Sequence, residues 1–158
     1  MKKLAFFIST LCYTGYFPKA PGTFGSLVSL PVIFVINYNF GFLGLFFITL
    51  IVFVISIFAV KKVLSYTEHD PSFIVIDEFI GQSMTFLLVA DSLKYNTKVY
   101  PYIIGFILFR IFDITKPFPV SYADKKMKNA LGVILDDIFA GIYATIILYF
   151  IFYFIKGF

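Results

Sequence analysis

Five of the nine acidic residues lie inside or at the edge of apolar runs, where carboxylates are unusual. They are Asp77, Glu78, Asp113, Asp136 and Asp137. A charge at the centre of a bilayer costs about 2.5–3.5 kcal/mol on insertion scales, so acids in such positions usually belong to a site or a transport path. We take these five carboxylates as the candidate site. The alternative is a set of ion pairs that only fixes the register of the helices.

The cations next to these acids are too few to neutralise them. Arg110 lies three residues before Asp113 and Lys116 three residues after it, so they share one face of a helix that should end before Pro117. Surplus carboxylates in a low-dielectric site need a divalent cation or must stay protonated. Oxygen donors from Asp and Glu suit Mg²⁺, which usually keeps waters and a substrate phosphate among its ligands.

A turn-rich segment at residues 17–26 offers groups that bind phosphate. It contains two prolines and two glycines and opens an apolar helix, where an anion binds favourably at the N-terminus. Lys19 adds a positive charge, and Thr23 and Ser26 add hydroxyl groups. The alternative for this segment is a plain structural loop.

Four segments, taken together and in this order, resemble the phosphatidylglycerophosphatase A family. They are KAPGTFGS at residues 19–26, IDEFIGQ at 76–82, FRIFDITKPFPV at 109–120 and DDIFAG at 136–141. The resemblance implies an all-helical integral membrane phosphatase that depends on Mg²⁺. Such an enzyme converts phosphatidylglycerol phosphate into phosphatidylglycerol and inorganic phosphate in bacterial phospholipid synthesis.

On this hypothesis each polar residue receives a role. The expected metal ligands are Asp77, Glu78, Asp113, Asp136 and Asp137. The expected catalytic residues are Asp77, Glu78, Asp113, Lys116 and Asp137. The expected substrate-binding residues are Lys19, Thr23, Ser26, Arg110 and Lys116. Attack on phosphorus by water and formation of a phosphoaspartate both stay open.

The elements that carry these residues are apolar helices. The chain has 158 residues, of which 60% are hydrophobic and 14% charged, against about 25% charged in typical soluble domains. We expect a single membrane domain over residues 1–158. Its fold class is an all-α polytopic bundle with short or re-entrant helices.

Gaps between charges indicate where the spans lie. Residues 20–60 carry no charge and exceed the roughly 20 residues of one crossing, so the chain should turn at Asn37–Asn39 and Gly41. This predicts arms at residues 24–36 and 40–60, and a further span at 138–155. The two runs at residues 79–90 and 99–109 are too short to span alone, and residues 4–17 should form an apolar or interfacial segment.

Positive charges beside spans usually mark the cytoplasmic side. If Lys19, Lys61 and Lys62 are cytoplasmic, residues 20–60 enter the membrane and return, and the short pair of runs does the same. Lys125, Lys126 and Lys128 then lie on that side too. We therefore expect a multi-pass protein of the bacterial cytoplasmic (inner) membrane with its polar site facing the cytoplasm.

Composition also excludes several classes. One Cys and one His exclude an internal disulfide and a zinc site of Cys and His ligands, and His69 is expected in a solvated loop. The 13 basic residues form no continuous stripe, so the expected partners are a lipid substrate and the membrane, without nucleic acid. A membrane ion or proton-coupled transporter that uses the intramembrane carboxylates is the alternative function, and a non-catalytic scaffold is the third class.

Overall fold

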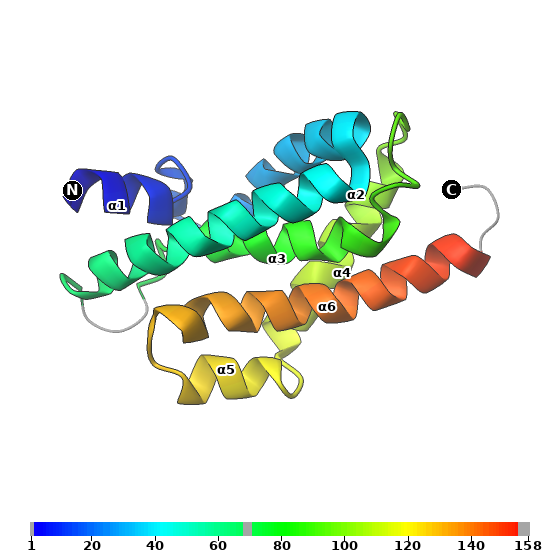
Figure 1. Ribbon diagram of the computed structural model, residues 1–158. Helices are drawn as coiled ribbons and strands as arrows, with labels where there is room; N and C mark the ends of the chain where they lie inside the picture. The colour runs from blue at the N-terminus through cyan, green and yellow to red at the C-terminus, as the bar shows by residue number, and fades with distance from the viewer. Residues whose placement is uncertain (1, 68–70, 155–158) are drawn as a thin grey trace.

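The computed structural model describes residues 2–67 and 71–154, and all regular structure within them is helical (Figure 1). The elements are α1 (Lys2–Ser9), η1 (Thr14–Tyr16), α2 (Pro21–Leu64), α3 (Ile76–Phe86), η2 (Leu87–Val89), α4 (Tyr100–Thr115), α5 (Val120–Lys126) and α6 (Ala130–Phe154), where η denotes a 3₁₀ helix. The predicted all-α class is confirmed. His69 and Ile155, which the sequence assigns to a loop and to the end of a span, lie outside the described residues.

Helix α2 folds back on itself at Gly41, so that it forms two arms (Figure 1). Gly41 has φ 60° and ψ −144°, a conformation that a residue with a Cβ atom rarely adopts. The second arm starts at Phe42, whose backbone N–H donates a hydrogen bond of 2.8 Å to Asp91 Oδ1. Asp91 therefore caps a helix that begins in the middle of an apolar segment.

The predicted reversal is present, but the two asparagines are not part of it. Asn37 and Asn39 belong to the first arm, which continues as helix up to Gly41 and is longer than the predicted residues 24–36. Asn39 donates a hydrogen bond of 2.8 Å to the carbonyl oxygen of Val35, one turn back, so its amide is satisfied without leaving the helix. The glycine alone turns the chain.

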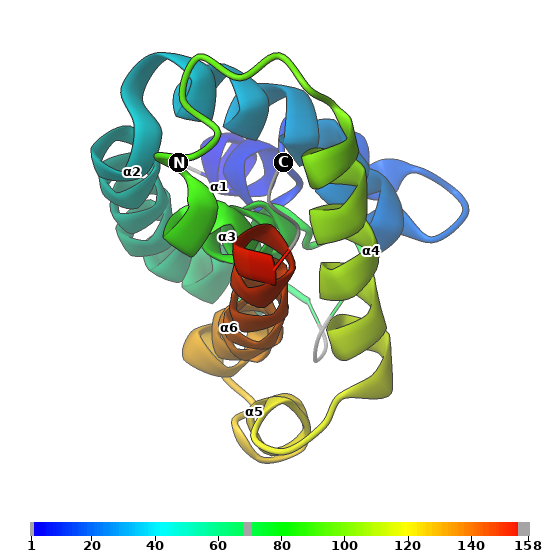
Figure 2. The same cartoon turned by 90° about the vertical axis from the view of Figure 1, so that its right-hand side faces the viewer.

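Helix α3 lies among α2, α4 and α6, and almost all of its residues are buried (Figure 2). A Cβ atom at Gly81 would lie 2.6 Å from the ring of Phe109 and 2.7 Å from the carbonyl oxygen of Asp137. A Cβ atom at Gly141 would collide with the carbonyl oxygen of Gly81. These two glycines let α3, α4 and α6 approach closely, within one turn of Glu78 and Asp137.

Two helices, α2 and α6, are long and apolar enough to cross a membrane. The second arm of α2 matches the predicted span at residues 40–60, whereas α6 begins eight residues before the predicted 138–155. Helix α3 with η2, and α4, correspond to the two predicted short runs. Residues 4–17 do not form one continuous segment, because α1 ends at Ser9 and left-handed residues precede η1.

The bundle has two different ends. The end of α2, all of α5 and the start of α6 lie at one end, on the left in Figure 1. The Gly41 turn, the start of α4 and the end of α6 lie at the other, which faces the viewer in Figure 2. The acidic residues of α3 and α6 belong to the first end, since both helices begin there.

Candidate active site

Glu78, in the first turn of α3, is held by two neighbouring helices. Arg110 Nη1 of α4 donates to Oε1 at 2.8 Å and to Oε2 at 2.6 Å, and Ser26 Oγ of α2 donates to Oε2 at 2.6 Å. A Cβ atom at Gly22 would meet Glu78 Oε1, so glycine lets the first turn of α2 pack on this carboxylate without displacing its side chain. The arrangement explains why the turn-rich segment and α3 share one site.

Arg110 also pairs with Asp113, one turn further along α4, at 3.0 Å from Nη1 to Oδ2. This i, i+3 contact confirms the helical spacing that the sequence predicts. Arg110 therefore joins carboxylates from α3 and α4. Its guanidinium is largely shielded from solvent, which strengthens these charge-assisted hydrogen bonds.

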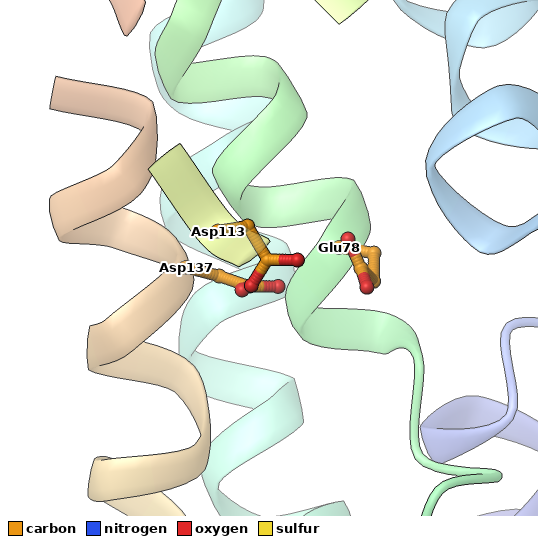
Figure 3. Close-up of side chains that lie close together, drawn as sticks. All are labelled: Glu78, Asp113 and Asp137. Carbon is orange, nitrogen blue, oxygen red and sulfur yellow. The ribbon is translucent and has the colours of Figure 1, made fainter. Parts of the chain in front are cut away.

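Three carboxylates from three helices converge beside this arginine (Figure 3). Glu78 of α3, Asp113 of α4 and Asp137 of α6 each offer an oxygen atom, and these atoms lie within 4.8 Å of one another. Glu78 and Asp137 are buried, at 7% and 4% exposure. We call Glu78, Asp113 and Asp137 the carboxylate triad. With a single guanidinium against three acids, the triad keeps a surplus of negative charge and fits a hard divalent cation.

A second cluster forms around Lys116, which caps the end of α4. Its backbone is left-handed, with φ 44° and ψ 57°, and its N–H donates to the carbonyl oxygen of Phe112 at 2.9 Å. This geometry directs Nζ to Asp124 of α5 and to Asp136 of α6, the latter at 3.2 Å. Burial lowers the pKa of Lys116, but the hydrogen bond to Asp124 and the charge of Asp136 outweigh it and raise the pKa above its ordinary value.

A cavity of about 400 Å³ adjoins the Lys116 cluster. Asp77, Asp124 and Asp136 are among the residues that line it. Asp77 directly precedes Glu78, and Asp136 directly precedes Asp137, so the cavity lies beside the helical turns that carry two members of the carboxylate triad.

The structure brings most of the predicted site residues together. Those in direct contact around the triad, or in the cavity and the Lys116 cluster next to it, are Ser26, Asp77, Glu78, Arg110, Asp113, Lys116, Asp136 and Asp137. Lys19 is exposed in the turn before α2, and Thr23 is half-buried in the first turn. Within the described residues, neither side chain bonds to these carboxylates.

Asp124 is part of the arrangement although sequence reasoning does not select it. It lies in the short helix α5, between polar and basic neighbours, where an acid is expected to be solvated. The acids selected from the sequence lie inside or at the edge of apolar runs, and Asp124 does not lie in one. Its partner Lys116 is eight residues away, across the proline-rich turn, and only the fold shows that the two meet.

Comparison with known proteins gives consistent matches. Residues 7–152 match the family model for "Phosphatidylglycerophosphatase A". A Bacteroides thetaiotaomicron protein named "Putative phosphatidylinositol-3-phosphatase" is 36% identical over 140 residues, which are 85% of this chain and 85% of that protein. Proteins named "Phosphatidylglycerophosphatase A" are 34% identical in Haemophilus influenzae (86% of this chain, 81% of that protein) and 31% identical in Escherichia coli (87% and 77%).

No solved structure matches the chain. The family model nevertheless extends over most of its length, and the residues it covers include the whole triad, Arg110 and the Lys116 cluster. The chain therefore belongs to the phosphatidylglycerophosphatase A family of lipid phosphatases.

Proposed function

We propose that this chain removes the terminal phosphate of phosphatidylglycerol phosphate in a Mg²⁺-dependent reaction, giving phosphatidylglycerol and inorganic phosphate in bacterial phospholipid synthesis. The observation that carries the proposal is the convergence of three carboxylates from α3, α4 and α6, two of them buried, beside one arginine. Membership of the family supplies the class of reaction.

The donor chemistry of the site fits Mg²⁺. Glu78, Asp113 and Asp137 would hold the ion, and Asp77 and Asp136 on the cavity wall are its further ligands or hold waters beside it. When bound, Mg²⁺ supplies positive charge that neutralises the phosphate oxygens and polarises the phosphorus centre. The triad is expected to bind it because its own surplus charge is then compensated.

The cations of the chain bind and orient the phosphate. Arg110 presents a guanidinium beside the triad, and Lys116 presents an ammonium group to Asp124 and Asp136, which line the cavity. Ser26 keeps the Glu78 carboxylate in one orientation through its 2.6 Å hydrogen bond. Lys19 and Thr23 would contribute from the turn before α2 and the first turn of that helix, because neither side chain bonds to the carboxylates.

The nucleophile is a water molecule or a carboxylate of the site. In the first case, a carboxylate such as Asp77 takes the proton of the attacking water. In the second, an aspartate attacks phosphorus and the acyl phosphate is then hydrolysed. Rapid quenching of a reaction with labelled substrate separates the two, since only the second leaves labelled protein.

The membrane topology follows from the charges at the site end. Ser26 and Glu78 place the start of α2 there, and Lys61 and Lys128 line one cavity there. Cations beside apolar helices favour the cytoplasmic side, so the site faces the cytoplasm and the chain is a multi-pass protein of the inner membrane. Accessibility labelling of single cysteines at Lys125 and Lys94 should then give opposite results in intact cells.

The name of the Bacteroides thetaiotaomicron relative supports phosphatidylinositol 3-phosphate as a second candidate substrate. Both lipids carry a phosphate monoester on the headgroup, which is the chemistry that the triad and its cations recognise. Transport through the carboxylates is the competing function. The triad lies near the first end of the bundle, where α3 and α6 begin, rather than at the middle of the long spans.

Phosphate release by the purified protein in mixed micelles tests the proposal. We expect release from phosphatidylglycerol phosphate with Mg²⁺ and none after chelation with EDTA. Phosphatidylinositol 3-phosphate and phosphatidic acid, assayed in parallel, identify the preferred headgroup. Ion-dependent uptake into liposomes without any phosphate release would overturn the enzyme in favour of a transporter.

A further inference from the structure

A second cavity, of about 510 Å³, adjoins the one that carries the carboxylates. The two share Leu64, Lys128 and Asn129 in their walls. Together they make a continuous recess whose inner part is acidic, with Asp77, Asp124 and Asp136, and whose outer part is basic. The basic part is lined by Lys61 from the end of α2, and Lys128, from the loop before α6, lies where the two parts meet.

Lys61 also ends an exposed apolar stripe on the second arm of α2. Phe47, Ile51, Val54 and Phe58 recur at helical spacing and are 54%, 52%, 46% and 69% exposed. Lys61 follows Phe58 by three residues on the same face. A diacyl lipid that lies along this stripe would have its acyl chains against the four apolar residues and its linking phosphate at the level of Lys61.

We propose that Lys61 and Lys128 form a subsite for the phosphodiester of the substrate, so that the protein selects phospholipid headgroups that carry both a diester and a monoester. The inference rests on the proposed phosphatase function. The monoester occupies the inner recess beside the triad, and the diester remains at the outer recess, beside the two lysines. The distribution of charge along the recess matches this order, because the metal site and the lysines each attract one phosphate.

Two inhibitors probe the two parts of the recess independently. Phosphatidylglycerol, the product, carries the diester without the monoester, and inorganic phosphate carries neither the diester nor the lipid. Both should inhibit phosphate release, the first through the outer recess and the second through the inner one. Mixed micelles of a neutral detergent keep the lipid mole fraction defined.

The test uses Lys61→Ala, Lys128→Ala and the double variant, with Lys125→Ala and Lys126→Ala as matched controls. The control lysines are exposed on α5 and do not line either cavity. We expect each test substitution to raise the KM for phosphatidylglycerol phosphate and the Ki of phosphatidylglycerol about 3- to 10-fold, as for the loss of one partly exposed charged hydrogen bond. Values of kcat and the Ki of inorganic phosphate should stay within about 2-fold of wild type.

Three outcomes overturn the subsite. They are an unchanged Ki of phosphatidylglycerol, an equal rise in the Ki of inorganic phosphate, and an equal effect in the control variants. Each leaves the proposed phosphatase function standing, because the wild-type protein still releases phosphate. If the wild-type protein releases none from any lipid, the proposed function fails instead, and direct binding of phosphatidylglycerol to the same variants still decides the subsite.

Discussion

Two isosteric substitutions in the carboxylate triad should have different effects on the stability of the metal-free protein. Glu78 accepts hydrogen bonds from Arg110 and Ser26, whereas none of the salt bridges among the described residues involves Asp137. Glu78→Gln removes a charge that is paired. Asp137→Asn removes a charge that is repelled by its neighbours. The shape of each side chain is nearly unchanged, so the difference reports on charge.

The magnitudes follow from these contacts. Loss of the charged hydrogen bonds of Glu78 should lower the free energy of unfolding by about 1.5–3 kcal/mol. For a protein of this size that corresponds to a fall in Tm of roughly 3–12 °C. Asp137→Asn should leave the metal-free Tm unchanged or raise it by a few degrees, because it relieves repulsion between buried carboxylates. Both variants should lose most of the rise in Tm that Mg²⁺ produces in the wild-type protein.

The assay is a thermal unfolding series in detergent with EDTA and with increasing Mg²⁺. The control is Asp91→Asn, at the opposite end of the bundle, which should keep the full Mg²⁺-induced rise in Tm. A metal-free Tm that falls as far in Asp137→Asn as in Glu78→Gln would refute the surplus of charge in the triad. An intact Mg²⁺ response in both variants would refute the triad as the metal site.

Three further predictions concern the scaffold and the second cluster. Asp91→Ala should lower the free energy of unfolding by about 1 kcal/mol, because Phe42 N–H loses its cap, and Asp91→Asn should restore most of it in the same denaturant series. Gly81→Ala should reduce both Tm and phosphate release, because its Cβ atom meets Phe109 and the backbone of α6. Ala140→Gly adds no atoms to the core cluster that contains Phe109; it is the comparison and should keep more activity. The raised pKa of Lys116 means that its charge is complete below the ordinary lysine pKa of about 10.4 and is lost only as the pH rises through the higher folded value. The pH profiles of phosphate release by wild type and Lys116→Arg should therefore run parallel from pH 6 to 9, and an extra limb in the wild-type profile within that range would contradict this.

Much of the fold follows from local chemistry. Helix α4 ends at Thr115, and Pro117 follows the capping residue Lys116 and prevents the helix from continuing. Gly41 turns α2 within an uncharged run that is too long for one membrane crossing. Both depend on backbone restrictions that a single residue imposes, so they are visible in a sequence. Asn37 and Asn39 mislead because an asparagine in an apolar helix can also remain helical, with its amide bonded one turn back or buried in the core.

The candidate site divides in the same way. The five candidate acids, three of which form the carboxylate triad, stand out in the sequence because acids in apolar runs are costly, and Arg110 stands out as the only arginine in the chain. The sequence does not show which three of the five converge. Asp124 is not predictable from these rules, since an acid in a polar helix needs no explanation until the fold places it on Lys116. Ser26 is predicted as a substrate-binding hydroxyl of the turn; it lies inside α2 and bonds to Glu78, a contact between residues far apart in the chain.

The most direct test of the central claim is phosphate release from phosphatidylglycerol phosphate by purified wild type and Asp137→Asn, each with Mg²⁺ and with EDTA. We predict that the wild-type protein releases phosphate only with Mg²⁺. In a folded Asp137→Asn protein the rate of release should fall by at least about 100-fold. Release that is independent of metal, or undiminished in Asp137→Asn, would contradict a phosphatase site built on Glu78, Asp113 and Asp137.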